Sequence, residues 1–204
     1  MGELTTDLLI SLDGFASGVD QPPHFGYIGS DLGKCVREHL DPPQIVVMGR
    51  ATYQALAQFS ATATDEVSAR MREIPKMVFS SILEEPLVWN NTHLNKGIVT
   101  NEMTTLKQQN GGPLRSIGSL SLVRSTFKAG LVDPLRLMFF PVILGNRGRE
   151  PIYTDFPQAA LELIRTRILD SAVIDSSMHY ESRVIASTAL SGNPLTHSRL
   201  CLRN

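Results

Sequence analysis

Four apolar stretches of the sequence are each followed at once by small, hydroxyl-bearing or guanidinium residues. These four clusters are Asp13-Gly14, Gly49-Arg50-Thr52, Ser80-Ser81 and Gly118-Ser119-Ser121. If the stretches are parallel strands of one sheet, the clusters follow their carboxyl ends and converge on one crevice, where open α/β sheets bind ligands. Hydroxyls and a guanidinium donate hydrogen bonds to anions, and glycines let the backbone approach. The pattern therefore predicts a site for a dinucleotide that carries an extra phosphate.

The second and third clusters suit a phosphate on a ribose. A guanidinium presents a planar pair of donors that matches a phosphate, so Arg50 is the candidate for the ribose 2′-phosphate. The hydroxyls of Thr52, Ser80 and Ser81 can donate to the same group. Because the 2′-phosphate distinguishes NADPH from NADH, these residues predict NADPH as the cofactor. The competing interpretation of Arg50 is a solvated arginine at the start of a helix.

The fourth cluster is the candidate for the pyrophosphate. The sequence predicts a strand over Leu114 to Ile117, a turn at Gly118-Ser119 and then a helix. A helix that opens directly from a strand aims unpaired N–H groups and its positive dipole end at the sheet edge. Gly118 has no side chain to block approach, and the Ser119 and Ser121 hydroxyls add donors. The competing interpretation is an ordinary strand-to-helix turn with a serine N-cap.

The turns are expected to lie between alternating strands and helices of an α/β fold. Strands are predicted over residues 4–12, 44–48, 76–79, 114–117 and 135–144, with weaker extended pieces at Trp89 and 98–99. Helices are predicted from Ser30 or Asp31 to Leu40, after Gly49, after a cap at Thr64, over 101–110, and after Ser119 with a C-cap at Gly130. The run 135–144 is too short to cross a bilayer and suits a strand buried on both faces.

Composition indicates one soluble domain. The chain has 204 residues, is 42% hydrophobic and carries a net charge of −1, which gives no electrostatic reason to expect nucleic acid or an anionic membrane as partner. Cys35 and Cys201 match no zinc or redox spacing, which suits a reducing, cytoplasmic compartment. The first residues lack the basic flank of a signal peptide. The apolar strands from 135 onward exceed what one sheet of this size needs to cover, which predicts a homodimer.

Five longer motifs carry a family resemblance. They are S-L-D-G-F at 11–15, V-M-G-R-A-T-Y at 47–53, K-M-V-F-S-S at 76–81, I-G-S-L-S-L at 117–122 and A-G-L-V-D-P-L-R-L-M-F-F-P-V-I-L-G at 129–145. The chain resembles the dihydrofolate-reductase-like family, which includes the C-terminal reductase domain of bifunctional riboflavin-biosynthesis deaminase-reductases, and is most similar to its stand-alone actinobacterial-type members. The resemblance implies a three-layer α/β domain over 1–185 with a mixed, mostly parallel eight-stranded sheet, NADPH as hydride donor, and commonly a homodimer. The tail 186–204 lies beyond it and has no assigned role.

The resemblance also implies roles for the clusters. Gly49, Arg50, Thr52, Ser80 and Ser81 would face the adenosine phosphate end. Gly118, Ser119, Leu120, Ser121 and Leu122 would face the pyrophosphate and the nicotinamide ribose. Leu120 stands where many relatives carry a small residue, so it would narrow the approach of the pyrophosphate. Relatives often have a cation beside Ser80, and here Ser81 takes its place.

Hydride reduction of a C=N or C=O bond also needs a proton. Asp31 occupies roughly the place, at the start of the helix after the first loop, where folate reductases have a carboxylate; otherwise it is a helix-start acid favoured by the dipole. Asp13 is the second candidate for catalysis, or else a turn-forming residue that orients the loop. Phe15, Phe25, Tyr27 and Tyr53 are expected to form an aromatic wall for the substrate.

The first loop also limits the substrate. No Lys or Arg lies between Gly14 and Gly33, although a ribose phosphate would call for one. The prediction is therefore an NADPH-dependent reductase of a pterin or dihydrofolate-like heterocycle. The alternatives are a 5-amino-6-(5-phosphoribosylamino)uracil-type reductase of riboflavin biosynthesis, and a dimeric NADPH-binding protein without turnover.

Overall fold

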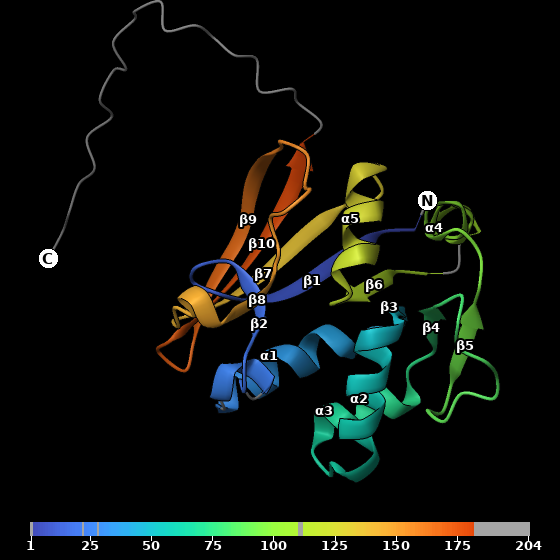
Figure 1. Cartoon of the computed structure of the whole chain (residues 1–204), viewed down its shortest axis with the longest axis horizontal. Coiled ribbons are helices and arrows are strands. Elements are labelled where there is room, and N and C mark those ends of the chain that lie inside the picture. The colour runs from blue at the N-terminus through green and yellow to red at the C-terminus, as the bar shows by residue number, and fades with distance from the viewer. Residues whose placement is uncertain (1, 22, 28, 110–111, 182–204) are drawn as a thin grey trace, which may run out of the picture.

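A central eight-stranded sheet organises the chain, as expected of the α/β class (Figure 1). The computed structural model describes residues 2–21, 23–27, 29–109 and 112–181, so the tail predicted over 186–204 lies outside the described residues. The strands of this sheet are β1 (Leu4–Ser11), β3 (Ile45–Gly49), β4 (Lys76–Phe79), β5 (Thr92–Asn95), β6 (Leu114–Ile117), β7 (Pro134–Phe140), β9 (Ala160–Leu169) and β10 (Val173–Glu181). Within the described ranges, no helix is long and apolar enough to span a bilayer.

The sheet is mixed but mostly parallel. Its order is β5-β4-β3-β6-β1-β7-β10-β9, and the strands from β5 to β7 are parallel, whereas β10 runs antiparallel to both of its neighbours. A separate antiparallel pair joins β2 (Phe15–Gly18) to β8 (Gly148–Pro151). Short 3-10 helices lie at η1 (Pro23–Gly26) and η2 (Gly145–Arg147).

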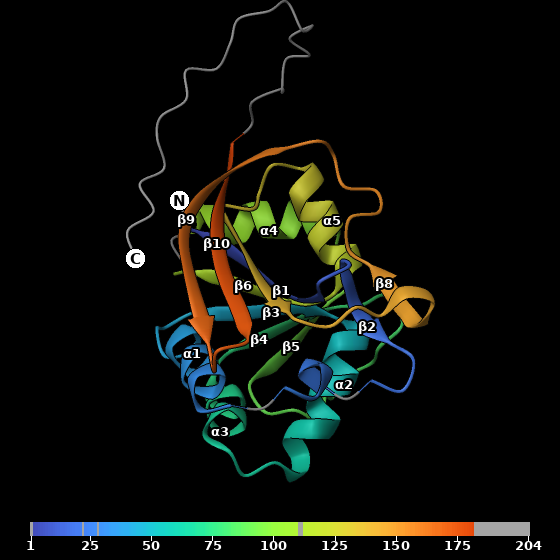
Figure 2. The same ribbon diagram turned by 90° about the vertical axis from the view of Figure 1, so that its left-hand side faces the viewer.

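Helices cover both faces of the sheet. Helices α1 (Ser30–Leu40), α2 (Arg50–Thr62) and α3 (Glu66–Glu73) lie on one side, and α4 (Val99–Gln108) and α5 (Leu120–Lys128) lie on the other (Figures 1 and 2). The alternation of β3 shows why: Val47 belongs to the core under α4 and α5, whereas Val46 and Met48 belong to the core under α1 to α3.

This topology opens a crevice between β3 and β6. The two strands are neighbours, yet the helices that follow them, α2 and α5, pack on opposite faces. Ligands of open α/β sheets bind at such a switch point. Strand β6 ends opposite Asp7 of β1, so β1 continues from Leu8 without β6 beside it. The crevice therefore has β1 as one wall.

Three local predictions need correction. Asp65, not Thr64, caps α3, because its carboxylate accepts the Ser68 N–H. Neither weaker extended piece is a strand, because Trp89 is buried in the core beside Tyr53 and Val99 begins α4. The extended segment of this region lies instead at β5. Strand β7 ends at Phe140, short of residue 144.

Candidate active site

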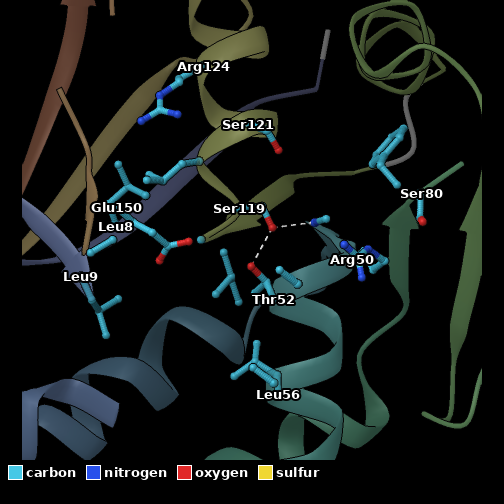
Figure 3. Close-up of a pocket in the computed structure, with 18 of the residues that line it drawn as sticks. Leu8, Leu9, Arg50, Thr52, Leu56, Ser80, Ser119, Ser121, Arg124 and Glu150 are labelled. Atoms are coloured by element: carbon cyan, nitrogen blue, oxygen red, sulfur yellow. Dashed lines mark hydrogen bonds between the residues drawn. The ribbon is translucent and has the colours of Figure 1, made fainter. Parts of the chain in front are cut away.

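A cavity of about 1010 Å³ opens at the carboxyl edge of the sheet between the starts of α2 and α5 (Figure 3). This is at the upper end of the roughly 300–1,000 Å³ typical of small-molecule sites. Nine of the ten predicted cofactor-binding residues line it, namely Gly49, Arg50, Thr52, Ser80, Ser81, Gly118, Ser119, Leu120 and Ser121. The tenth, Leu122, is 2% exposed and packs in the core under α5, so its side chain does not face the cavity.

Two helix N-termini meet at this cavity without side-chain caps. Neither Gly49, the N-cap of α2, nor Ser119, the N-cap of α5, makes a capping hydrogen bond to its own helix. The first N–H of α5 with a helical acceptor is that of Val123, which donates to the Ser119 carbonyl. The N–H groups of the first turns are therefore left to face the cavity, where two dipole ends favour an anion.

The Ser119 hydroxyl joins the two turns. It accepts the Gly49 N–H at 2.6 Å and donates to the Thr52 hydroxyl at 2.7 Å. Ser119 has a left-handed backbone with φ +61°, which turns its side chain toward β3. This corrects its predicted role as a phosphate donor, because its hydroxyl is already used. Ser121 has no hydroxyl partner among the described residues, so its hydroxyl remains available to a ligand.

The Arg50 end of the cavity is polar and open. The Arg50 guanidinium is exposed and contacts the Gln54 side chain at 3.4 Å, with no carboxylate partner in the part of the chain that the structure describes. The Ser80 hydroxyl accepts the N–H groups of Ile82 and Leu83, which fixes the loop after β4 and leaves its own proton free to donate. This end can bind a phosphate through the guanidinium and hydroxyls.

Gly118 needs to be glycine on two counts. Its φ is +60°, and a Cβ built there would lie 3.3 Å from the Thr52 hydroxyl oxygen. Leu120 lines the cavity and also packs partly against the core. The turn therefore gives a ligand access to backbone N–H groups on the side away from Leu120's core contacts.

Neither predicted catalytic acid lines the cavity. The Asp31 carboxylate accepts the Asp170 N–H at 3.4 Å, at the hairpin between β9 and β10, while Asp170 caps the start of α1 in return. Asp13 accepts the Ser11 hydroxyl and the N–H groups of Leu144 and Gly145. Desolvation acts to raise the pKa of Asp13, but these hydrogen bonds outweigh it and hold the pKa below its usual value. Asp13 is thus an ionised clamp between two loops, which is a poor proton donor.

The predicted aromatic wall is also placed elsewhere. The rings of Phe25 and Tyr27 make tilted contacts with the ring of Phe140, in the core that includes residues of α1. Tyr53 is 4% exposed, and its hydroxyl accepts the Val88 N–H in the core below α2. Phe15 lies in β2 and is not among the residues that line the cavity. These rings shape the scaffold and do not contact the cavity.

Two charged residues that line the cavity, Arg124 and Glu150, were not predicted from the sequence. Arg124 lies one helical turn after Ser121, a spacing that could have revealed it; its Nη2 donates to the Pro151 carbonyl, and its buried Nε has no partner among the described residues. Glu150 lies in β8, and its carboxylate accepts the Ser17 hydroxyl of β2 at 2.9 Å. No local signal marks Glu150, because its position depends on the pairing of β2 with β8.

Glu150 has a strained backbone. Its φ is +57°, in the left-handed region that costs a residue other than glycine about 1–2 kcal/mol. Figure 3 shows its carboxylate directed into the cavity, toward the side where Thr52 and Ser119 lie. Glu150 is one of nine non-glycine residues with positive φ in the described part of the chain, and it is one of the two that line this cavity, with Ser119.

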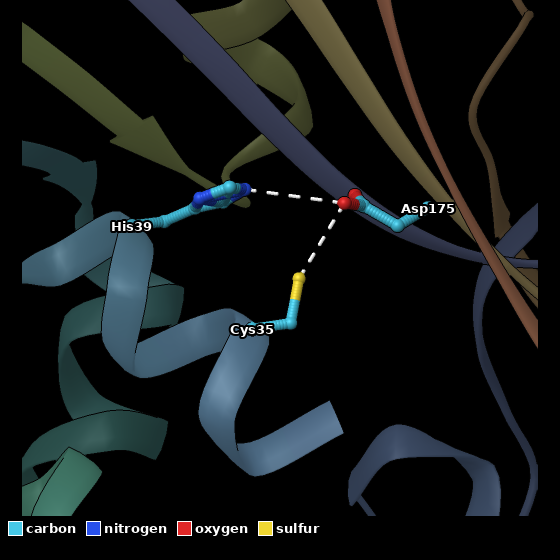
Figure 4. Close-up of side chains that lie close together, drawn as sticks. All are labelled: Cys35, His39 and Asp175. Carbon is cyan, nitrogen blue, oxygen red and sulfur yellow. Dashed lines mark hydrogen bonds and ion pairs between the residues drawn. The ribbon is translucent and has the colours of Figure 1, made fainter. Parts of the chain in front are cut away.

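A second polar cluster lies under α1, away from the cavity. Cys35, His39 and Asp175 point toward one another, and their ligand atoms lie within 4.8 Å (Figure 4). Arg167 already fills the space between them, because its Nη2 is 2.7 Å from Cys35 Sγ and 3.1 Å from Asp175 Oδ2. Burial and the charge of Asp175 raise the pKa of Cys35 to about 11. Because metals bind the thiolate, the raised pKa disfavours Cys35 as a metal ligand. The cluster is therefore an ion network.

That network extends across the sheet as a row of alternating charges. Arg115 of β6 pairs with Asp7 of β1 at 2.7 Å, and Arg136 of β7 lies between Asp7 at 3.5 Å and Asp175 of β10 at 3.3 Å. Arg167 of β9 completes the row at Asp175. Each charge has an opposite neighbour, which buried charges require.

Similarity to known proteins identifies the family of the chain. A family model described as the RibD C-terminal domain matches residues 3–180. The chain belongs to the RibD C-terminal domain family. This RibD C-terminal domain is 26% identical over 180 residues to the uncharacterized protein YyaP of Bacillus subtilis (strain 168), covering 85% of the chain and 93% of YyaP.

Solved structures agree on the fold. A putative riboflavin biosynthesis protein from Shewanella sp. PV-4 has a TM-score of 0.66 at 19% identity, covering 88% of this chain and 99% of that one. The dihydrofolate reductase of Enterococcus faecalis, solved in complex with NADP(H), has a TM-score of 0.60 at 15% identity, covering 88% and 96%. These confirm the dihydrofolate-reductase-like fold expected from the sequence motifs.

Proposed function

We propose that this RibD C-terminal domain is an NADPH-dependent reductase of a small pterin or dihydrofolate-like heterocycle. The observation that carries the proposal is the cavity on which two uncapped helix N-termini converge, with Arg50 at one end. A dinucleotide with a third phosphate presents anions that match these donors. Family membership and the NADP(H) complex of the Enterococcus faecalis reductase support it.

The residues divide into two ends. Arg50, Ser80 and Ser81 would hold the ribose 2′-phosphate, and the N–H groups from residue 120 onward with the Ser121 hydroxyl would hold the pyrophosphate. When bound, NADPH would supply a hydride. Leu8, Leu9 and Ala16 line the cavity on its β1 and β2 side, and their apolar surface suits a flat heterocycle.

Replacement of Arg50 tests the cofactor assignment. Arg50→Ala should weaken the binding of NADPH by roughly 1.5–3 kcal/mol, which is about ten- to hundredfold in affinity. The affinity for NADH should stay nearly unchanged, because only NADPH has the 2′-phosphate. Titration of both cofactors measures this. Arg37→Ala is the control, since Arg37 pairs with Asp41 on α1 and does not line the cavity. Equal affinity of the parent for both cofactors would contradict the assignment.

Arg124 favours a second candidate function, a reductase of a phosphoribosylaminopyrimidine. Its guanidinium lines the cavity without a carboxylate partner among the described residues, so it could bind a substrate phosphate. No Lys or Arg lies between Gly14 and Gly33, so the cation for the substrate phosphate would then be Arg124 of α5. Arg124→Ala should selectively impair reduction of 5-amino-6-(5-phosphoribosylamino)uracil in this case, and dihydrofolate reduction should be spared. Binding of NADPH with no oxidation by either compound would indicate the non-catalytic alternative.

A further inference from the structure

The cavity is lined by one carboxylate within the described part of the chain, that of Glu150. Among its lining residues in the described part of the chain, the charged ones are Arg50, Arg124 and Glu150, and no His, Lys, Asp, Cys or Tyr lines it. Both guanidinium groups stay protonated at all relevant pH values. Asp31 and Asp13 are engaged elsewhere by backbone N–H groups. Among the lining residues of the described part of the chain, Glu150 is therefore the one side chain that can bind a cationic ligand group through a negative charge.

The surroundings of Glu150 leave its carboxylate available. One oxygen accepts the Ser17 hydroxyl, and no Lys, Arg or His pairs with it within the described ranges. Each carboxylate oxygen has two acceptor sites, so the group can accept further hydrogen bonds. Leu8, Leu9 and Ala16 provide an apolar wall in the same cavity. A carboxylate beside such a wall suits a flat ring that carries N–H donors or a positive charge.

We propose that the Glu150 carboxylate binds the protonated ring nitrogen of the substrate at the bond that is reduced. The proposal rests on the proposed reductase function and places the substrate acid on β8, in contrast to the position expected on α1. The ligand class is a basic nitrogen heterocycle with a C=N bond beside a second N–H donor.

The step balances without any change of charge on Glu150. The ring nitrogen takes a proton from water, and the carboxylate stabilises the resulting cation. When bound, NADPH would supply the hydride for the new C–H bond and would be oxidised to NADP⁺. The C=N π pair would become the lone pair of the nitrogen, which would keep its proton and become neutral beside the Glu150 carboxylate. Glu150 thus favours the protonated substrate, the form that accepts hydride more readily.

The probe is 2,4-diaminopyrimidine, titrated calorimetrically with and without NADPH. We expect Glu150→Gln to weaken its binding about tenfold or more, because a charge-assisted pair is lost, and to change NADPH affinity less than twofold. Glu84→Gln is the matched control, since Glu84 is an exposed acid that pairs with Lys96 outside the cavity. Glu150→Gly should also lose the probe without a fall in melting temperature, because glycine relieves the positive φ.

The outcomes separate the two claims. Equal probe binding by the parent and Glu150→Gln, or no probe binding by the parent, would overturn the role of Glu150. A parent that binds the probe through Glu150 but shows no NADPH affinity would refute the cofactor assignment and retain the acid. A fall in melting temperature of Glu150→Gly would show that the residue is kept for structure.

Discussion

Replacement of Ser119 by alanine tests whether one hydroxyl holds the two helix starts of the cavity together. The Ser119 Oγ accepts the Gly49 N–H at 2.6 Å and donates to Thr52 Oγ1 at 2.7 Å. Alanine removes both bonds and keeps the left-handed backbone, so the change isolates the hydroxyl. The Gly49 N–H, at the end of β3, then loses its partner.

The expected cost follows from these two bonds. Each contributes a net of about 1 kcal/mol, so Ser119→Ala should destabilise the fold by about 2 kcal/mol, and more if the Gly49 N–H stays buried without a partner. For a domain of this size, 2 kcal/mol lowers the melting temperature by about 4–8 °C. The cofactor should also bind more weakly, because the two N-termini are no longer fixed relative to each other.

Urea denaturation and melting curves of three single variants and one double variant measure the effect. Ser121→Ala, whose hydroxyl has no partner among the described residues, should change stability by less than about 0.5 kcal/mol while it weakens NADPH binding. A double-mutant cycle with Thr52→Val should show coupling of about 0.5–1.5 kcal/mol. Unchanged stability in Ser119→Ala, or zero coupling to Thr52, would refute this reasoning.

Three further results are expected. Gly118→Ala should have a lower melting temperature and should lose the rise in melting temperature that NADPH induces. Gly112→Ala, at φ +87° in open space, should also melt lower but should keep that rise. If both variants keep the rise, the pyrophosphate binds elsewhere. Leu163 is 61% exposed on edge strand β9 and should lie in a homodimer interface. Leu163→Lys should therefore reduce the mass measured by light scattering toward the 22.4 kDa of one chain. A parent protein of that mass would exclude the dimer. Burial lowers the pKa of Lys76 from 10.5 to about 8, so the unfolded chain binds more protons at this site between these values. The Lys76 contribution to stability should therefore rise with pH across that window, against the opposite contribution of Cys35 above pH 9, and the stability difference between Lys76→Met and the parent in urea denaturation should shift with pH in favour of the parent.

The convergence of three polar clusters on one cavity was predictable because each cluster is a turn local in sequence. The clusters at Gly49, Ser80 and Gly118 each directly follow a buried strand, and parallel strands bring their carboxyl ends to one edge. The inward position of Tyr53 was also readable, since Tyr53, Leu56 and Ala57 recur at helical spacing and pack on one core.

The Glu150 side of the cavity was not predictable in the same way. Glu150 lies at the cavity because β8 pairs with β2. This pairing is long-range, since Ser17 and Glu150 are 133 residues apart along the chain. Asp31 lies in the first turn of α1 as predicted, whereas its catalytic role rested on the family resemblance, and its neighbour Asp170 comes from the β9–β10 hairpin. Long-range pairing decides the surroundings of both residues, and no local pattern encodes it.

The row of charges from Arg115 to Arg167 also determines how the strands can align while the chain folds. Side chains alternate between the two faces of a strand, so a slip of β7 by one residue would move Arg136 to the α5 face and leave Asp7 and Asp175 buried without their shared cation. Misaligned sheets would thus be selectively destabilised. The ion pairs of Arg136 therefore favour the native register at the β7–β10 boundary, where parallel pairing changes to antiparallel.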